Sequence, residues 1–319
     1  MKRVGCGCPA EFCKLADRAK GSAYDKLAEG RRRAGYAMIS SLDHIVLLAP
    51  DIEVAVGLYS TLLGRAPDWR AEPDAGSATA LFQLGNTALE LIAPRGPGPG
   101  GDHLRARITQ EGPGLKSLAF RCSDLSSGHR TLTRLALNPG PIEDGESHDT
   151  GRQTRRTWRR FRCPPEAGAG VRWFFVEPLG TLLEPAEVPL GHVHALDHLV
   201  INTPNPDRAM ALYGAKLGLR LALDRSVPEW GVRLIFFRTG GLTLEIAHRL
   251  GQGDDPNGPD SFWGLTWRVG DIEAAHARLA ARGFSLSDVR TGRRPGTRVF
   301  TVRDGTLNVP TLFISGVAD

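Results

Sequence analysis

The chain contains one stretch twice, in altered form. Residues 41–69 read SLDHIVLLAPDIEVAVGLYSTLLGRAPDW, and residues 195–223 read ALDHLVINTPNPDRAMALYGAKLGLRLAL. In both copies Leu-Asp-His opens an apolar run that ends at a proline, and a segment with the apolar spacing of a helix follows. At 319 residues the chain is long enough for two domains of about 150 residues each. The repeat therefore predicts a duplicated α+β chain.

Each copy of the repeat begins a longer unit. In the first copy the helix is followed by two short strands, ATALFQLG and TALELIAP, with a hairpin turn at residues 85–86. With a less regular strand around APDWRAE, the unit has the order βαβββ and ends at the expected linker PRGPGPGG. The same order recurs from LKSLAFRC, from LDHLVI and from WGLTWRV. Four modules thus form two pairs, which predicts one domain over residues 39–190 and another over 191–319.

The N-terminal segment differs from these modules. Residues 1–38 show no strand alternation, and we expect a weakly ordered extension that precedes the physiological start at Met38. Three of the five cysteines lie there in CGCPAEFC, without a second cluster that would complete four metal ligands. The odd number of cysteines and the lack of a secretory signal favour a cytoplasmic location over a disulfide framework.

The composition argues against two classes of partner. No apolar run approaches the roughly 18 residues needed to span a bilayer, so we expect no membrane association. The net charge of +5 sits largely in two local runs, GRRRAG and GRQTRRTWRRFR, rather than in a basic face interleaved with aromatic residues. We therefore expect no nucleic-acid partner. A small-molecule substrate is the expected partner, and a homodimer is compatible with the sequence.

The modules resemble the vicinal oxygen chelate superfamily, which includes glyoxalase I, extradiol dioxygenases and the bleomycin-resistance proteins. The residues that carry the resemblance are LDHIVL with TALELIAP, LDHLVI with LTLEIA, and WRVGDIEAAHARLAARGF, and the likeness extends from Leu42 to Ile314. It implies an α+β fold of four βαβββ modules paired into two glyoxalase-like curved-sheet domains. It also implies a cavity in each domain, with metal ligands on the first and last strands of the modules.

Two His and Glu pairs occupy such positions. They are His44 with Glu90 and His198 with Glu245, at spacings of 46 and 47 residues. Imidazole and carboxylate together hold Zn, Mn, Fe or Ni, so a divalent metal is the implied cofactor. A carboxylate inside an apolar strand is costly to bury unless it is paired or binds a metal. Strand alternation places His248 on the face opposite Glu245, so His248 is rejected as its partner.

Each ligand set looks incomplete. Where the resemblance places the next ligand, the chain has Lys116 or Ser117 in the second module and Gly264 in the fourth. The corresponding carboxylate position falls near Trp173 and near Thr311, and Glu177 is a candidate third ligand in the first domain. Three interpretations stay open: a divalent-metal site, a metal-free pocket in which His and Glu bind substrate or transfer protons, and a structural pair.

Three further residues are candidates for substrate binding. Trp263 and Trp267 flank the position of the missing ligand in the fourth module. Arg298 shares a strand face with apolar residues, where it would pair with Glu245 or bind a substrate carboxylate. The alternative for Arg298 is an edge-strand arginine in solvent.

The functional prediction is a metal-dependent enzyme of the glyoxalase and dioxygenase type, a lyase or oxidoreductase that acts on a small oxygenated organic substrate. Glu245 and Glu90 are its candidate catalytic bases. The alternative is a metal-independent protein of the bleomycin-resistance type that binds or sequesters a small molecule. Neither half holds a full ligand set, which argues against extradiol cleavage and against glyoxalase activity on glutathione adducts.

Overall fold

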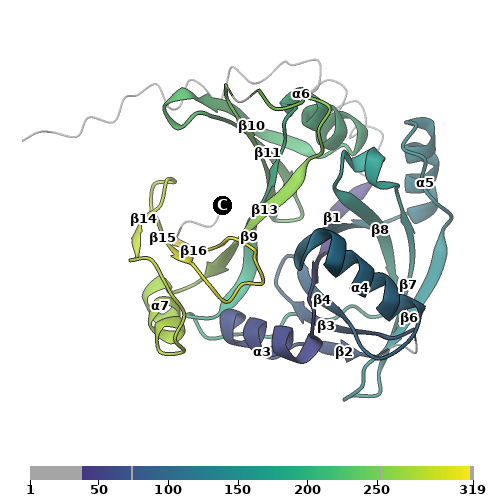
Figure 1. Ribbon diagram of the computed structural model, residues 1–319, viewed down its shortest axis with the longest axis horizontal. Helices are drawn as coiled ribbons and strands as arrows, with labels where there is room; N and C mark the ends of the chain where they lie inside the picture. The colour runs from purple at the N-terminus through teal and green to yellow at the C-terminus, as the bar shows by residue number, and fades with distance from the viewer. Residues whose placement is uncertain (1–37, 73–74, 252, 317–319) are drawn as a thin grey trace, which may run out of the picture.

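Two curved eight-stranded sheets form the body of the protein (Figure 1). The computed structural model describes residues 38–72, 75–251 and 253–316, so the expectations for residues 1–37 lie outside it. Each sheet carries two modules, which confirms the predicted α+β fold of paired modules. Among the described residues, no helix is long and apolar enough to cross a membrane.

The first sheet has the strand order β2-β3-β4-β1-β5-β8-β7-β6. Its elements are β1 (Ile39–Leu48), α3 (Ile52–Leu63), β2 (Trp69–Ala71), β3 (Ser77–Gln83), β4 (Ala88–Pro94), α4 (Pro99–Glu111), β5 (Gly114–Cys122), α5 (Leu125–Arg134), β6 (Glu143–His148), β7 (Arg155–Arg162), the 3₁₀ turn η1 (Pro165–Gly168) and β8 (Arg172–Leu179). β1 pairs in parallel with β4 and antiparallel with β5, and β5 pairs in parallel with β8. The two modules therefore meet at β1 and β5.

The second sheet repeats this arrangement in the order β10-β11-β12-β9-β13-β16-β15-β14. Its elements are β9 (Val193–Asn202), α6 (Pro206–Ala209), the π-helical η2 (Met210–Lys216), β10 (Arg220–Val227), the 3₁₀ turn η3 (Pro228–Trp230), β11 (Val232–Thr239), β12 (Leu242–Arg249), β13 (Ser261–Val269), α7 (Ile272–Ala280), β14 (Arg290–Thr291), β15 (Thr297–Val302) and β16 (Thr311–Gly316). β9 and β13 take the places of β1 and β5.

The duplication extends to the aromatic core. Phe161 stacks on Phe175 with ring centroids 4.9 Å apart, and a histidine meets Phe161 edge-on at 5.1 Å. In the second sheet Phe300 stacks on Phe313 at the same 4.9 Å, again with a histidine edge-on at 5.1 Å. Such rings bury large apolar areas, so they hold each helix of the second and fourth modules against its sheet.

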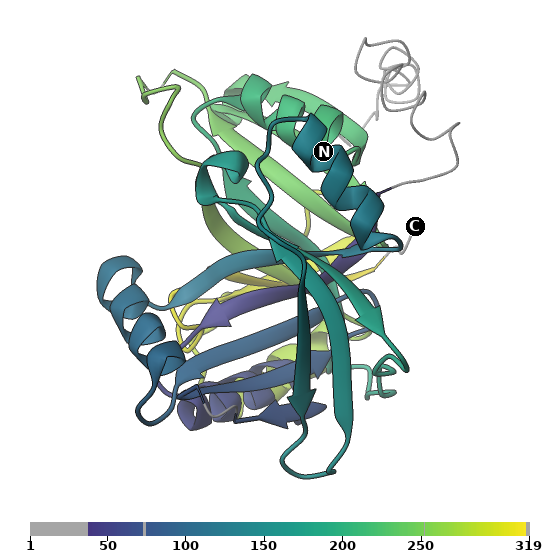
Figure 2. The same ribbon diagram turned by 90° about the vertical axis from the view of Figure 1, so that its right-hand side faces the viewer.

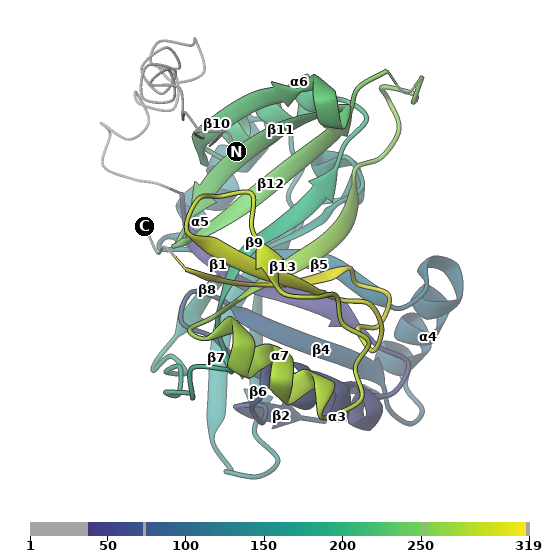
Figure 3. The same ribbon diagram turned by 90° about the vertical axis from the view of Figure 1, so that its left-hand side faces the viewer.

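The two sheets share one continuous core of buried apolar side chains. Helices α3 and α7 lie side by side (Figures 1 and 3), and the Arg278 guanidinium donates hydrogen bonds to the carbonyls of Thr61 and Leu62. The predicted turn at residues 85–86 is also an interdomain contact, because Asn86 exchanges two hydrogen bonds with the backbone of Leu196. The shared apolar core and these hydrogen bonds together hold the two halves against each other.

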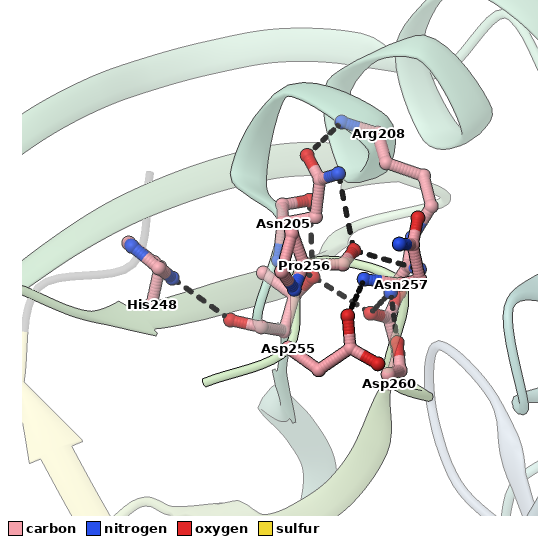
Figure 4. Close-up of polar contacts among 9 residues, drawn as sticks. Asn205, Arg208, His248, Asp255, Pro256, Asn257 and Asp260 are labelled. Carbon is pink, nitrogen blue, oxygen red and sulfur yellow. Dashed lines mark hydrogen bonds and ion pairs between the residues drawn. The ribbon is translucent and has the colours of Figure 1, made fainter. Parts of the chain in front are cut away.

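A polar cluster secures the loop between β12 and β13 (Figure 4). The buried Asp260 carboxylate accepts hydrogen bonds from Arg208 and from the Thr203 hydroxyl, each at 2.6 Å. Its backbone amide donates to the carbonyl of Ala169 in the first half of the chain. His248 lies 3.0 Å from the Thr203 carbonyl, in accordance with its rejection as a partner of Glu245.

Three elements differ from the sequence expectation. The Gly/Pro linker runs into helix α4, because close-packed glycines allow the amides of residues 100 and 101 to donate to the Ala75 carbonyl. The helix of the third module is α-helical only at residues 206–209 and then continues as the π-helix η2. The expected strand FSLSDVR is reduced to β14 and a single bridge between Leu286 and Val302.

Candidate functional site

The first sheet closes into a barrel around a cavity of about 760 Å³. Its edge strands are joined by Trp69, which donates a 2.9 Å hydrogen bond to the Ser147 hydroxyl, and by the Thr150 amide, which donates to the Arg70 carbonyl. The β6–β7 hairpin, teal in the lower part of Figure 2, carries this closing wall. The volume lies within the range typical of small-molecule sites.

His44 and Glu90 face each other in this cavity. His44 lies on β1 and Glu90 on the parallel neighbour β4, and both line the cavity wall. His44 Nε2 lies 3.5 Å from Glu90 Oε2. Ala88 and Ile92, each two residues from Glu90 on β4, line the same wall.

A buried carboxylate holds the His44 ring. His44 Nδ1 donates a 2.8 Å hydrogen bond to Asp43 Oδ1, and Arg121 Nε donates a 2.7 Å hydrogen bond to Asp43 Oδ2. Burial by itself would raise the pKa of Asp43, but the hydrogen bond to His44 and the charges of His44 and Arg121 lower it to about 2. Burial alone would lower the pKa of His44, but Asp43 and Glu90 raise it, so the imidazolium is favoured.

Arg156 supplies a cation on the opposite wall. It lies on β7, lines the cavity, and its guanidinium stacks over the Trp69 ring at 5.4 Å from the centroid. Burial lowers the pKa of Arg156, whereas the carboxylates of Asp43 and Glu90 act in the opposite direction. Among the described residues Arg156 forms no ion pair within 4.0 Å, although Arg121 and Arg160 do. Its guanidinium is therefore available to a bound anion.

The second module does not complete a metal site. Helix α3 has its N-cap at Asp51, seven residues after His44, and α5 has its N-cap at Asp124, seven residues after Ser117. Of the two candidates Lys116 and Ser117, Ser117 is therefore the counterpart of His44. Strand register makes Phe174 the counterpart of Glu90, one residue beyond the predicted Trp173, which is buried in the core. Since catalytic zinc takes about three protein ligands, the donors His44 and Glu90 do not fit such a site.

The prediction that Glu177 is a candidate third metal ligand in the first domain is wrong. Within β8 the residues Phe174, Val176 and Pro178 line the cavity, as does Leu179 at the strand end, and alternation turns Glu177 to the other face. There it pairs with Arg159, whose Nε donates a 2.8 Å hydrogen bond to Glu177 Oε2. Within the described parts of the chain, no group of three or more His, Cys, Asp and Glu side chains could hold a metal ion.

The second sheet carries a similar pair. His198 Nε2 lies 3.7 Å from Glu245 Oε2, and the Thr266 hydroxyl lies 2.9 Å from the same nitrogen. Asp197 lies beside His198 and accepts a 2.6 Å hydrogen bond from Arg268. Burial raises the pKa of Glu245. The hydrogen bond between Thr266 and His198 gives the His198 ring a protein partner on the side that faces Glu245.

The counterparts in the fourth module again lack ligands. Gly264 lies seven residues before the α7 N-cap Asp271, as His198 lies seven before Asn205, so it is the counterpart of His198. The register of β13 and β16 places Leu312 at the carboxylate position, one residue beyond the predicted Thr311. Glycine has no side chain and the leucine side chain has no donor atom, so neither position supplies a metal ligand.

The three predicted substrate-binding residues are not brought together. Arg298 is half exposed and forms a 2.5 Å ion pair with Glu273 of α7, as expected for an arginine in solvent. Trp267 is fully buried in the core, whereas Trp263 is half exposed. Trp267 shares the core-facing side of β13 with Leu265 and Val269, whereas Thr266 on the opposite side lies against His198.

Sequence reasoning missed Arg121, Arg268 and Arg156. The first two each stand three residues before a helix N-cap aspartate, in RCSD and RVGD, and each binds the aspartate next to the site histidine. That recurrence in two modules was a usable signal. Arg156 stood inside the run RRTWRRFR, which is part of one of the two local basic runs, and nothing distinguished it from its neighbours.

These features define a tandem glyoxalase-like protein whose first half holds a cavity lined by a His and Glu pair. Residues 42–192 match a family model described as a glyoxalase-like domain. Residues 197–301 match the model of the glyoxalase/bleomycin resistance protein/dioxygenase superfamily. The chain therefore belongs to this superfamily, also called vicinal oxygen chelate.

Curated relatives are named as epimerases. An ethylmalonyl-CoA/methylmalonyl-CoA epimerase of Cereibacter sphaeroides is 39% identical over 94 residues, which cover 28% of this chain and 70% of that protein. A mitochondrial methylmalonyl-CoA epimerase of Bos taurus is 31% identical over 72 residues, which cover 23% of this chain and 41% of the relative. The similarity is therefore confined to a part of this chain, and in the Bos taurus relative to less than half of its length.

Solved structures share the two-domain fold. A triple mutant of 4-hydroxymandelate synthase from Streptomyces coelicolor superimposes with a TM-score of 0.62 at 17% identity, and covers 88% of this chain and 93% of that chain. A fusion of a xylose isomerase-like TIM barrel with a 4-hydroxyphenylpyruvate dioxygenase superimposes with a TM-score of 0.57 at 14% identity, and covers 89% of this chain and 50% of that one. At such identities the likeness concerns the fold.

Proposed function

We propose that the first domain is an enzyme that binds a small oxygenated organic acid and moves a proton at the carbon next to its carbonyl or carboxyl group. The observation that carries the proposal is the cavity of about 760 Å³, in which Arg156 lacks an ion-pair partner among the described residues and His44 faces Glu90. An arginine is well suited to a carboxylate, which it binds with two parallel hydrogen bonds. Glu90 and His44 then act as base and acid.

The proposed step needs no further reactant. Glu90 removes the proton from the substrate carbon, and the electron pair of the C–H bond moves onto the neighbouring oxygen. The His44 imidazolium, favoured by Asp43 at 2.8 Å, stabilises the negative charge on that oxygen. Return of the proton to either face of the carbon regenerates both groups. The relatives named as epimerases support this chemistry, since epimerisation at such a carbon requires the loss and return of one proton.

Substitution of Arg156 tests the proposed binding of an anion. We expect Arg156→Gln to weaken the binding of 2-oxo and 2-methyl carboxylates by about 10- to 100-fold, because a hydrogen bond to a charged group contributes about 1.5–3 kcal/mol. Isothermal titration calorimetry on the full chain measures the effect. Arg155→Gln is the matched control, since Arg155 is its neighbour on the same strand but is exposed and pairs with Glu146. Equal affinities in the two variants would contradict the proposal.

Proton exchange separates the remaining alternatives. The full chain, dialysed against EDTA, is incubated in D₂O with the acids that bind, and NMR follows the replacement of the C–H proton. Exchange without metal supports the proposal. Exchange only after addition of Zn, Mn, Fe or Ni would contradict the metal-free form and favour the metal-dependent enzyme predicted from the sequence. Binding without exchange under either condition would favour a sequestering protein.

A further inference from the structure

The segment between the two sheets forms part of the cavity wall. Residues 180–190, called here the strap, connect β8 to β9, and Thr181, Leu182 and Leu183 of the strap line the cavity. Leu183 packs against a small apolar cluster that is separate from the main core. The cluster consists of Trp69, Ala71, Leu81 and Ala88. The strap therefore contributes side chains to the site and does more than join two domains.

Both ends of the strap are fixed. Its first end follows Leu179, which is paired with Thr157 of β7, and Gly180 with a φ of 77° lets the chain turn away from β8. At its far end the Leu190 carbonyl accepts a 2.8 Å hydrogen bond from the Asp271 amide at the start of α7. A segment held at both ends presents its side chains to the cavity at little additional entropic cost when a ligand binds.

The apolar side chains at the cavity lack a cover. Leu179 is 42% exposed and Leu182 is 43% exposed, although both line the cavity. Next to them lie Leu183 and the Trp69 ring, on which the Arg156 guanidinium stacks. An anion bound to Arg156 would thus have this apolar wall beside it. Covering exposed apolar area contributes about 25 cal/mol per Å².

The size of the cavity also indicates a larger ligand. A volume of about 760 Å³ corresponds to on the order of 25 water molecules at about 30 Å³ each. An acid of three carbons would leave most of it filled with water against leucine side chains. We propose that the substrate is a carboxylate bearing a bulky apolar group, branched or aromatic, and that Leu182 and Leu183 of the strap select it. This inference rests on the proposed function of the same cavity.

A homologous series of acids tests the inference. Straight-chain and phenyl-substituted 2-oxo carboxylates of three to nine carbons are titrated by calorimetry into the wild-type chain, Leu182→Ser, Leu183→Ala and the control Leu190→Ala. In the wild type we expect affinity to rise about three- to fourfold for each buried methylene. Leu182→Ser and Leu183→Ala flatten this rise and leave the three-carbon acid unchanged. Leu190 is 70% exposed and does not line the cavity, so its variant keeps the wild-type series.

The outcomes distinguish the two proposals. Affinity that does not depend on chain length, while Arg156→Gln still weakens every acid, overturns the strap inference alone. If affinity rises with chain length but Arg156→Gln does not change it, the proposed anion site is overturned. The inference that the strap forms an apolar wall for the substrate then stands. Equal weakening of all acids by the strap variants also overturns the inference. Leu182→Ser keeps the test valid if Leu183→Ala unfolds, because Leu182 lies at the surface.

Discussion

Glu90→Gln will reduce proton exchange at the substrate carbon by about 10³-fold, while Glu245→Gln will leave it within twofold. A positioned acid or base contributes about 10²- to 10⁴-fold, and the amide cannot accept the proton. The substitution keeps the size of the side chain, so binding through Arg156 is preserved and kcat falls more than KM rises. Exchange rates from NMR in D₂O, together with calorimetric affinities, measure both quantities.

Glu245→Gln is a matched control because the chain is duplicated. Glu245 stands at the position of Glu90 in the second sheet, with His198 Nε2 at 3.7 Å. His198 differs from His44 because the Thr266 hydroxyl lies 2.9 Å from its Nε2. Loss of exchange in Glu245→Gln with activity retained in Glu90→Gln would contradict the proposal and assign the chemistry to the second sheet.

The fold was largely predictable because its signals are local and repeated four times. Apolar runs and helix caps each recur at a fixed distance, so one irregular module could be aligned with the others. Helix α4 escaped prediction because its start depends on glycines packed against Ala75, a contact between segments that are distant in the sequence. The boundaries 39–190 and 191–319, the homodimer and the cytoplasmic location stay predictions.

The candidate site was predictable only in part. His44 and Glu90 were found because the resemblance places ligands on the first and last strands of a module, and β1 and β4 pair in regular register. Trp263 and Trp267 were chosen because they flank Gly264, but Trp267 lies in the core and Trp263 is half exposed. Strand alternation could not identify Arg156. That arginine stacks on Trp69, and Trp69 lies beside it because the barrel closes through the hydrogen bond from Trp69 to Ser147. Closure is a property of the whole sheet and leaves no local pattern.

Asp43→Asn will destabilise the protein by about 2–3 kcal/mol at pH 7. The carboxylate is buried and hydrogen-bonded to both His44 and Arg121, so the amide leaves two cationic groups without their counter-charge. A pKa lowered from 3.8 to about 2 corresponds to about 2.4 kcal/mol by linkage. Because the folded-state pKa lies below the unfolded one, this contribution is fully present above about pH 4 and is lost as the pH falls through 2.

The pH dependence makes this effect separable from general acid denaturation. Urea unfolding of the wild type and Asp43→Asn between pH 7 and pH 2 gives the difference in unfolding free energy, which we expect to shrink to a few tenths of a kcal/mol at the acid end. The variant also lowers the pKa of His44, because the hydrogen bond and charge that raise it are gone. Histidine NMR detects that shift, and Asp197→Asn should leave the His44 titration unchanged. A difference that is independent of pH would mean that Asp43 stabilises the barrel by packing and that its charge does not set the state of His44.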